Sequence, residues 1–464
     1  MSNPQEGVNL NDLLPQVMNG LTELKSSYGE YPMHPSQQVS PAAAQEVLAE
    51  LLERLEGNAP LYSRGYIGQM LKPPHPVAVA AYLATMQINP NNHSIDGGRA
   101  TTLMEREVLE QMAAMFDYPT DYLGHLTWSG TTANLEGLWV SRELRPDKAI
   151  VFSKDAHYTH ARMAEVLNVP SIGIPTDAEG KMNLVALEEQ LQQGNVSVVV
   201  ATLGTTGLGA IDPLAEILAL AKKYQVRVHV DAAYGGFFKL ILDLLEPETA
   251  RHFSVIGQAD SIVVDPHKQG LQPYGSGSVF FKDHTVGRFY KHDSPYTYFA
   301  SKDVHFGEIQ LETSRAGASA AAFWATTKVL PLSRSGLGEV LAAQRRATMH
   351  WFKLLSDSQY LVPYQAPELD ILAYFPKVSK MSEIDQISEQ VFREAFNAPR
   401  ADQLHLAEYK VSAEALLARG HSIEADIPVA RILRSVVMKP EHEPVIADIH
   451  SRIESITKAL ITNE

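Results

Sequence analysis

The middle of the chain alternates between two kinds of segment, and this pattern limits the folds that it can adopt. Between residues 103 and 281, short runs rich in β-branched residues alternate with segments whose apolar residues recur at helical spacing. Such alternation predicts a mostly parallel sheet covered by helices on both faces. Ligands of these sheets bind beyond the carboxyl ends of the strands. The expected strands are Ala149–Phe152, Val196–Leu203, Val226–Val230, Ser261–Val264 and Ser278–Phe281, and the expected helices are Leu103–Phe116, Asn134–Leu144 and Pro213–Tyr224.

The helix expected at Pro213–Tyr224 has a recognisable start. Asp212 stands in the N-cap position, where a carboxylate accepts hydrogen bonds from the free amides of the first turn. Pro213 follows in the first turn, where its fixed φ suits a helix. We therefore expect Asp212 to cap this helix.

The flanking segments predict two further units. Pro41–Glu56 has the spacing of a helix with one apolar face, which needs a larger body or another subunit to cover it. A helix at Ala316–Leu330 ends at a break near Pro331. A smaller C-terminal α/β unit is expected after it, with a helix near Leu337–Ser356, strands near Ile371–Phe375 and Arg431–Met438, and a last helix from Val445. The predicted domains are residues 1–72, 73–330 and 331–464.

Composition excludes several classes of function. A net charge of −15 disfavours nucleic acid and anionic membranes as partners. The chain has no cysteine, so disulfides, thiolate metal sites and a cysteine nucleophile are excluded. No basic start with an apolar core marks a signal peptide, and no apolar run approaches the roughly 20 residues of a membrane helix. We expect a cytoplasmic protein with no metal.

Residues whose side chains can take part in catalysis or binding follow the expected strands. Val230 leads into Asp231, Val264 into Asp265–Lys268, and Leu203 into a Gly-Thr-Thr turn that ends at Thr206. A further turn, Trp128–Asn134, precedes a helix. Taken singly, each is more often a cap, a plain turn or a surface residue. All of these segments lie either just after an expected strand or just before an expected helix, and this shared placement favours a common site.

The set matches what pyridoxal phosphate needs. Its phosphate needs amide and hydroxyl donors at a helix N-terminus, which Ser129, Gly130 and Thr131 can supply. Its aldehyde needs a lysine for a Schiff base, and Lys268 fits. Its ring nitrogen needs a carboxylate to stay protonated, and Asp231 fits. The small side chain of Ala233 permits close approach to the ring.

These segments resemble the group II pyridoxal-phosphate-dependent amino-acid decarboxylases, which have fold type I. Residues 265–283 look closest to the tyrosine/aspartate decarboxylases of archaeal type and their bacterial relatives. The resemblance covers about Gly65 to Pro331 and is weaker on either side. It rests on His229–Gly236, Asp265–Lys268, Ala201–Thr206 and Asp155–His157.

The resemblance implies a role for each cofactor contact. It makes Lys268 the Schiff-base lysine and Asp231 the partner of the ring nitrogen. It places Ala233 under the ring, His157 on the opposite face and Thr206 near the phenolic oxygen. Ser129, Gly130 and Thr131 would hold the phosphate, and Asp265 and His267 would lie near it. The turn departs from the family's usual Gly-Gly-Thr-Glu-Ala-Asn, which leaves cofactor binding little affected.

The substrate side is less defined. Arg434 is a candidate for the α-carboxylate of the substrate, and Tyr66 and Arg99 are further candidates. Residues 96–101, which include Arg99, depart from the family's pattern, and this leaves the substrate open. The family's mobile loop corresponds to Lys291–Phe306, where Tyr298 or Tyr296 would act near proton return, unless these aromatics pack at a subunit interface.

The expected function is decarboxylation of an aromatic or acidic L-amino acid, tyrosine- or aspartate-like, through Lys268. The resemblance also implies a homodimer with the active site at the subunit interface. Two alternatives stay open. One is carbon–carbon lysis or amine oxidation on the same fold, and the other is a non-catalytic homologue.

Overall fold

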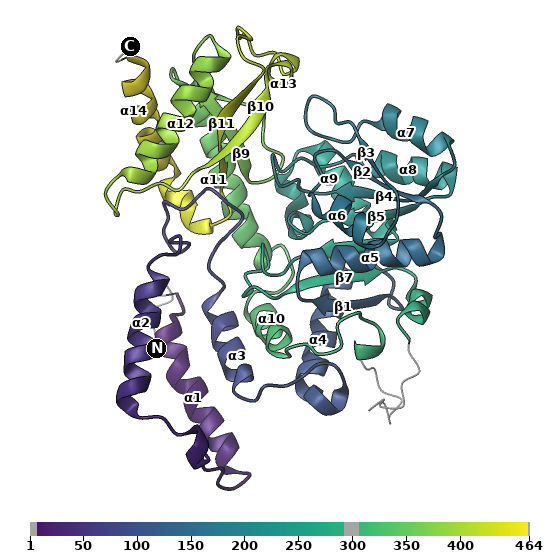
Figure 1. Cartoon of the computed structure of the whole chain (residues 1–464), viewed down its shortest axis with the longest axis vertical. Helices are drawn as coiled ribbons and strands as arrows, with labels where there is room; N and C mark the ends of the chain where they lie inside the picture. The colour runs from purple at the N-terminus through teal and green to yellow at the C-terminus, as the bar shows by residue number, and fades with distance from the viewer. Residues whose placement is uncertain (1–6, 292–305, 463–464) are drawn as a thin grey trace.

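The structure is a computed structural model, and it describes residues 7–291 and 306–462 (Figure 1). A seven-stranded sheet forms the centre of its larger part, in the order β1-β7-β6-β5-β4-β2-β3. Neighbours from β3 to β6 run parallel, whereas β7 is antiparallel to both β6 and β1. The strands are β1 (Leu123–Thr127), β2 (Ala149–Ser153), β3 (Ser171–Ile174), β4 (Val196–Thr202), β5 (Arg227–Asp231), β6 (Ser261–Val264) and β7 (Gly277–Phe281). The mostly parallel sheet is confirmed, and its antiparallel edge is an addition.

Helices cover both faces of this sheet because its strands point apolar side chains to each side. On β4, Val198 and Val200 pack toward α5 and α6, whereas Val199 and Ala201 belong to the larger core on the other face. The helices of this part are α4 (Ile95–Met115), α5 (Gly130–Leu144), α6 (Thr159–Val166), α7 (Leu184–Gln192), α8 (Leu214–Tyr224), α9 (Pro247–Ser254) and α10 (Ala318–Val329). Short 3-10 helices are η2 (Gly236–Leu244), η3 (Ile256–Gln258), η4 (His284–Phe289) and η5 (Phe306–Glu308).

The expected cap of α8 is wrong. Pro213 occupies the N-cap position and makes no side-chain cap bond. The carboxylate of Asp212 is fully buried and instead accepts from the backbone amides of Met182, at 2.7 Å, and Thr202, at 2.8 Å. These two amides are buried, so leaving them without an acceptor would cost free energy. The free amides at the start of α8 can instead bind other partners. Burial raises the pKa of Asp212 to about 7 despite these two bonds.

The C-terminal part is built on a four-stranded antiparallel sheet in the order β10-β11-β9-β8. Its core includes Trp351, Tyr374 and Leu433, all fully buried. The strands are β8 (Leu361–Pro363), β9 (Ile371–Pro376), β10 (Ala407–Ser412) and β11 (Val429–Val436). The helices are α11 (Leu337–Asp357), α12 (Met381–Asn397), α13 (Ala413–Ala418), η6 (Pro440–Val445) and α14 (Ile446–Thr462). The smaller α/β unit is therefore confirmed, whereas the exact domain limits stay a prediction.

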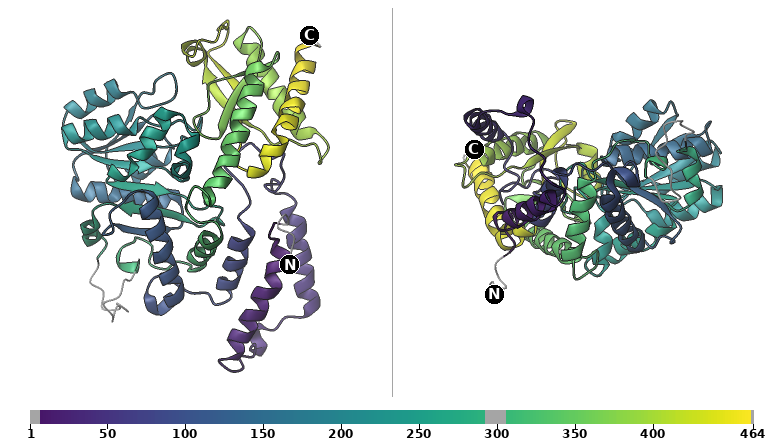
Figure 2. Two further views of the ribbon diagram at one scale, coloured as in Figure 1. Left: turned by 180° about the vertical axis from the view of Figure 1, so that it is seen from behind. Right: turned by 90° about the horizontal axis from the view of Figure 1, so that it is seen from below.

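Helices α1 (Leu10–Ser26) and α2 (Pro41–Leu55) extend away from both sheets, whereas α3 (Pro76–Met86) packs on α10 of the larger part (Figures 1 and 2). The short 3-10 helix η1 (Pro35–Gln37) lies between α1 and α2 in the sequence. Helix α1 packs on α3, but no residue of α2 is buried. Within the described ranges, none of the helices combines the length and the apolar character needed to cross a membrane.

Candidate active site

A cavity of about 270 Å³ lies where β4, β5 and β6 end and α5 begins. This is the edge of a parallel sheet at which ligands are expected. The cavity brings together all of the residues expected to hold the cofactor. Its lining is Ser129, Gly130, Thr131, Asn134, His157, Tyr158, Thr159, Thr202, Gly204, Thr206, Asp231, Ala233, Tyr234, Asp265, His267 and Lys268.

The N-terminus of α5 forms one wall of the cavity. Ser129 is the N-cap residue, and its hydroxyl accepts from the amide of Thr132 at 3.3 Å. Gly130 allows the helix to approach Asp265 closely, because a Cβ at this position would lie 2.4 Å from the Oδ2 atom of that carboxylate. The free amides and dipole of a helix N-terminus favour an anion here.

Lys268 lies in the turn that follows β6 and lines the same cavity. Its Nζ is 3.1 Å from Oδ2 of Asp265, and about a quarter of its side chain is exposed. His267 lies beside it, with its ring against the ring of Tyr274 at a centroid distance of 4.6 Å. Burial lowers the pKa of His267. Three buried polar atoms nearby have no hydrogen-bond partner among the described residues: Oδ1 of Asp265, Nδ1 of His267 and Oγ of Ser276.

Asp231 is the last residue of β5, is buried and lines the cavity. Its Oδ1 accepts from the amide of Ala233 at 3.1 Å, and its Oδ2 lies 2.9 Å from Nε2 of His160. Burial alone raises the pKa of Asp231, but the bond from His160 and the charges of His160 and Lys268 together lower it below its ordinary value. Asp231 is therefore ionised at neutral pH.

His157 also lines the cavity and is half-buried. Burial lowers the pKa of His157. The carboxylate of Asp231 raises this pKa and the charge of Lys268 lowers it, and the net shift is downward, so the ring is neutral at pH 7. The ring lies 4.3 Å from the ring of Tyr158, measured between centroids. A neutral aromatic ring on this wall suits contact with a flat ligand.

Sequence reasoning missed several residues of this site. Tyr158, Thr159, Thr202, Gly204, Tyr234 and Asn134 line the cavity without having been predicted. Asn134 lies near the start of α5 and Thr202 is the last residue of β4. Their places at a helix start and a strand end were the signal that could have identified them. His160 lies in the first turn of α6, whereas His157 precedes that helix, so no helical spacing links the two histidines and no local pattern marked His160.

Other predicted residues do not line the cavity. Tyr66 is buried, with its ring 5.0 Å from Nζ of Lys439. Arg99 is exposed on α4. Arg434 is buried, and its guanidinium donates to the carbonyls of Thr206 at 2.5 Å and Gly207 at 2.7 Å. Their roles toward the substrate stay predictions. Tyr296 and Tyr298 lie outside the described residues.

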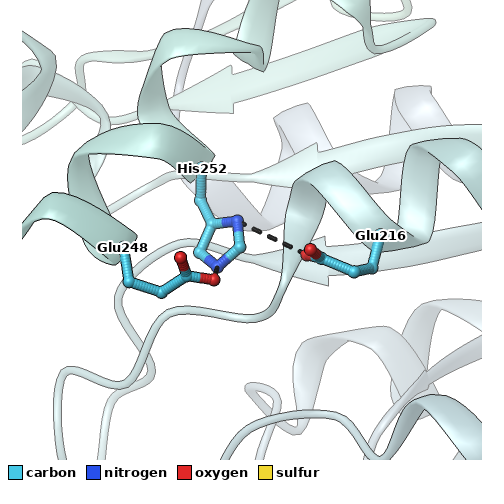
Figure 3. A group of neighbouring side chains, drawn as sticks. All are labelled: Glu216, Glu248 and His252. Atoms are coloured by element: carbon cyan, nitrogen blue, oxygen red, sulfur yellow. Dashed lines mark ion pairs between the residues drawn. The ribbon is translucent and has the colours of Figure 1, made fainter.

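A separate group of side chains of the types that can bind a metal lies on α8 and α9 (Figure 3). Glu216 and Glu248 flank the ring of His252, but Arg251 forms ion pairs with both carboxylates. Nδ1 of His252 accepts from the amide of Ala215 at 3.4 Å. Both negative charges and one ring nitrogen are thus already engaged by protein groups.

The family comparison decides between the possible uses of the cavity. The profile of the pyridoxal-dependent decarboxylase conserved domain matches residues 72–349. The chain belongs to this family. It is an amino-acid decarboxylase, and its cofactor is pyridoxal phosphate. The non-catalytic alternative and the amine-oxidising alternative receive less support than decarboxylation.

Individual relatives agree with this assignment. The decarboxylase is 27% identical over 452 residues to the L-tyrosine decarboxylase of Enterococcus faecium, with 74% of each chain covered. It is 28% identical to a probable L-tyrosine/L-aspartate decarboxylase of Methanosphaera stadtmanae, over 71% of this chain and 82% of that one.

Solved structures establish the fold. Mouse CSAD matches with a TM-score of 0.77 at 18% identity, covering 96% of this chain and 98% of that one. Oryza sativa TDC, solved with PLP and tryptamine, matches with a TM-score of 0.74 at 16% identity, covering 98% and 99%. The expected fold type of pyridoxal-phosphate enzymes is therefore confirmed.

The residues of the cavity fit this cofactor. A helix N-terminus with hydroxyl side chains suits its phosphate, an ionised aspartate suits its ring nitrogen, and one lysine lines the same cavity. The unpaired buried atoms of Asp265, His267 and Ser276 leave polar groups ready for a polar ligand. The volume is near the lower end of ligand pockets, roughly 300–1,000 Å³.

Proposed function

We propose that this decarboxylase acts on an aromatic L-amino acid of the tyrosine type, releasing CO2 and the corresponding amine. The observation that carries the proposal is the charge of the cavity. Lys268 is the only lysine or arginine in the described lining, and the histidines at 157 and 267 have lowered pKa values. A carboxylate side chain would need a cation to bind. An aromatic side chain needs no cation, only an apolar or aromatic surface, which Tyr158 offers in this lining.

The relatives include this class. Several carry L-tyrosine or L-tyrosine/L-aspartate in their names, and others carry L-aspartate alone. An acidic substrate is therefore the second candidate. It would need a cation, and Arg99, an expected substrate residue, is exposed on α4 and does not line the described cavity.

We assign the cofactor contacts as follows. Lys268 holds pyridoxal phosphate covalently, and Asp231 pairs with its ring nitrogen. The start of α5 holds the phosphate, while His157 and Ala233 contact the two faces of the ring. When bound, the cofactor supplies an electron sink for the electron pair left by the departing carboxylate.

The protein's own contribution is orientation and charge. Asp231 keeps a negative charge in the lining of the cavity, where two hydrogen bonds fix its position. Fixing these groups in advance avoids the cost of ordering them during the reaction. A proton must return to the substrate's Cα, and Tyr298 or Tyr296 stays the predicted donor.

A substrate screen tests the proposed function. Purified holoenzyme should release CO2 from L-tyrosine or another aromatic L-amino acid, with one amine formed per CO2, and should leave L-aspartate and L-glutamate unchanged. Trapped CO2 and chromatography of the amine measure both products. Release from acidic substrates alone would overturn the substrate class. An aldehyde with ammonia and oxygen uptake would indicate amine oxidation instead.

We further propose that the enzyme is a homodimer, in which a second copy covers α2. Five residues of this helix form an apolar face, and all are about half exposed or more: Val47, Leu48, Leu51, Leu52 and Leu55. An isolated helix of this length is marginal in water, so its apolar face needs a partner. Helix α1 also exposes Met18 and Leu24. A twofold arrangement would let each copy cover the same face of the other.

Charge placed on this face should separate the subunits. The double variant Leu48→Glu with Leu52→Glu is expected to elute as a monomer, whereas the unaltered protein should have twice the 51.1 kDa of one chain. Light scattering during size-exclusion chromatography measures both masses. Val185→Glu is the matched control, because Val185 is 70% exposed on α7, outside the N-terminal helices. A dimer that survives the double substitution would contradict the proposal.

A further inference from the structure

His160, which no sequence pattern singled out, lies directly against Asp231. It belongs to the first turn of α6 and is fully buried. Its Nε2 is 2.9 Å from Oδ2 of Asp231, across 71 positions of sequence. An ionised carboxylate only accepts hydrogen bonds, so Nε2 must carry a proton and donate it.

The carboxylate of Asp231 is held at both oxygens. His160 donates to Oδ2, and the backbone amide of Ala233 donates to Oδ1 at 3.1 Å. The two donors come from different elements, α6 and the turn after β5. Together they fix both the position and the rotation of the carboxylate, while Asp231 still lines the cavity.

Apart from Asp231, the surroundings of the His160 ring include one aromatic ring and, at electrostatic range, the histidines at 157 and 229. Its ring faces the ring of Phe152 at a centroid distance of 5.9 Å. Its Nδ1 is buried and has no hydrogen-bond partner among the described residues. An unpaired buried nitrogen costs free energy. The bond to Asp231 is the single polar contact of this ring within the described part of the chain, so it is the contact that offsets that cost.

The charge of Asp231 depends on this contact. Burial opposes ionisation of the carboxylate, and the hydrogen bond from His160 is the largest of the influences that counter it. A ring nitrogen of a bound cofactor stays protonated only while an ionised carboxylate faces it. A contact that keeps the carboxylate ionised therefore acts on the cofactor through one intermediate residue.

We propose that His160 is a positioning residue that orients Asp231 and keeps it ionised toward the ring nitrogen of bound pyridoxal phosphate. This role rests on the proposed function, because it reaches the cofactor only through Asp231. His160 does not line the cavity and is not a catalytic residue.

Two amide variants separate the donor from the rest of the side chain. The amide nitrogen of glutamine can occupy the place of Nε2, so His160→Gln keeps a donor to Asp231. Asparagine is one methylene shorter and cannot reach, so His160→Asn removes that donor with similar chemistry. His160→Phe is a second donor-free variant that fills the volume, so the comparison survives if one variant fails to fold.

The primary readout is the ring nitrogen itself, not activity. Each variant is loaded with pyridoxal phosphate labelled with ¹⁵N at that atom, and its chemical shift is recorded. The unaltered enzyme and His160→Gln should show a protonated nitrogen, whereas His160→Asn and His160→Phe should shift toward the unprotonated value. In the donor-free variants kcat should fall about 10- to 100-fold, the range expected for a hydrogen bond to a charged group, with KM changed far less.

The outcomes are distinct. Equal ¹⁵N shifts in all four proteins would overturn the role of His160. A fall in kcat as large in His160→Gln as in His160→Asn would overturn it too. An unaltered enzyme that binds no pyridoxal phosphate would instead contradict the proposed function. Circular dichroism and thermal melting identify any variant whose loss comes from misfolding.

Discussion

Replacing Lys268 with alanine is expected to lower kcat roughly 1,000-fold or more, because the group that holds the cofactor covalently is lost. The remaining contacts, above all the start of α5 and Asp231, should still bind pyridoxal phosphate non-covalently. The absorbance of the lysine-linked cofactor should disappear. Spectrophotometry of the loaded protein and CO2 release under saturating cofactor measure the two effects.

The matched control is Lys282→Ala. Lys282 is exposed and directly follows β7, which pairs with the strand that leads to Lys268. It should keep full activity and the full absorbance of the linked cofactor. A Lys268→Ala variant that retained the activity of this control would show that another residue holds the cofactor.

Replacing Asp231 with asparagine is expected to have the second-largest effect. A neutral amide cannot keep the ring nitrogen protonated, so kcat should fall roughly 100- to 1,000-fold, the loss typical of one electrostatic group in an active site. Covalent attachment at Lys268 should persist, because the substitution alters neither Lys268 nor its partner Asp265. Affinity for the cofactor should also weaken, since a charged pair is lost. Kinetics and equilibrium titration with pyridoxal phosphate measure these changes.

Asp147→Asn is the control for this charge change. Asp147 is exposed in the turn between α5 and β2, away from the cavity. Its substitution should leave kcat and cofactor affinity unaltered. An Asp231→Asn variant with unchanged kcat would mean that the carboxylate does not face the ring nitrogen.

Much of the fold could be predicted because its strands are long apolar runs. All of β4 is buried, and its valines leave little alternative to a central strand. The edge was harder. β1 has the sequence Leu-Gly-His-Leu-Thr, which lacks β-branched apolar residues, yet His125 is fully buried because Glu136 accepts from its Nε2 at 2.9 Å. Such a partner 11 residues away cannot be inferred from the strand itself.

The candidate site shows the same division. Asp231 is the last residue of β5 and Lys268 lies in the turn after β6, so sheet topology was enough to place them near one another. Asp212 also follows a strand, but its carboxylate binds two buried amides and caps no helix. His160 reaches Asp231 only through the packing of α6 on the sheet. Local sequence therefore located the groups at strand ends, and tertiary packing determined their partners.

The most direct test of the central claim is to find the lysine that carries the cofactor. The loaded enzyme is reduced with borohydride, which makes the link permanent, then digested and sequenced by mass spectrometry. The account predicts a phosphopyridoxyl group on Lys268 and on no other lysine. The same group on a different lysine, such as the buried Lys72, would contradict it, as would a fully loaded enzyme with no labelled peptide.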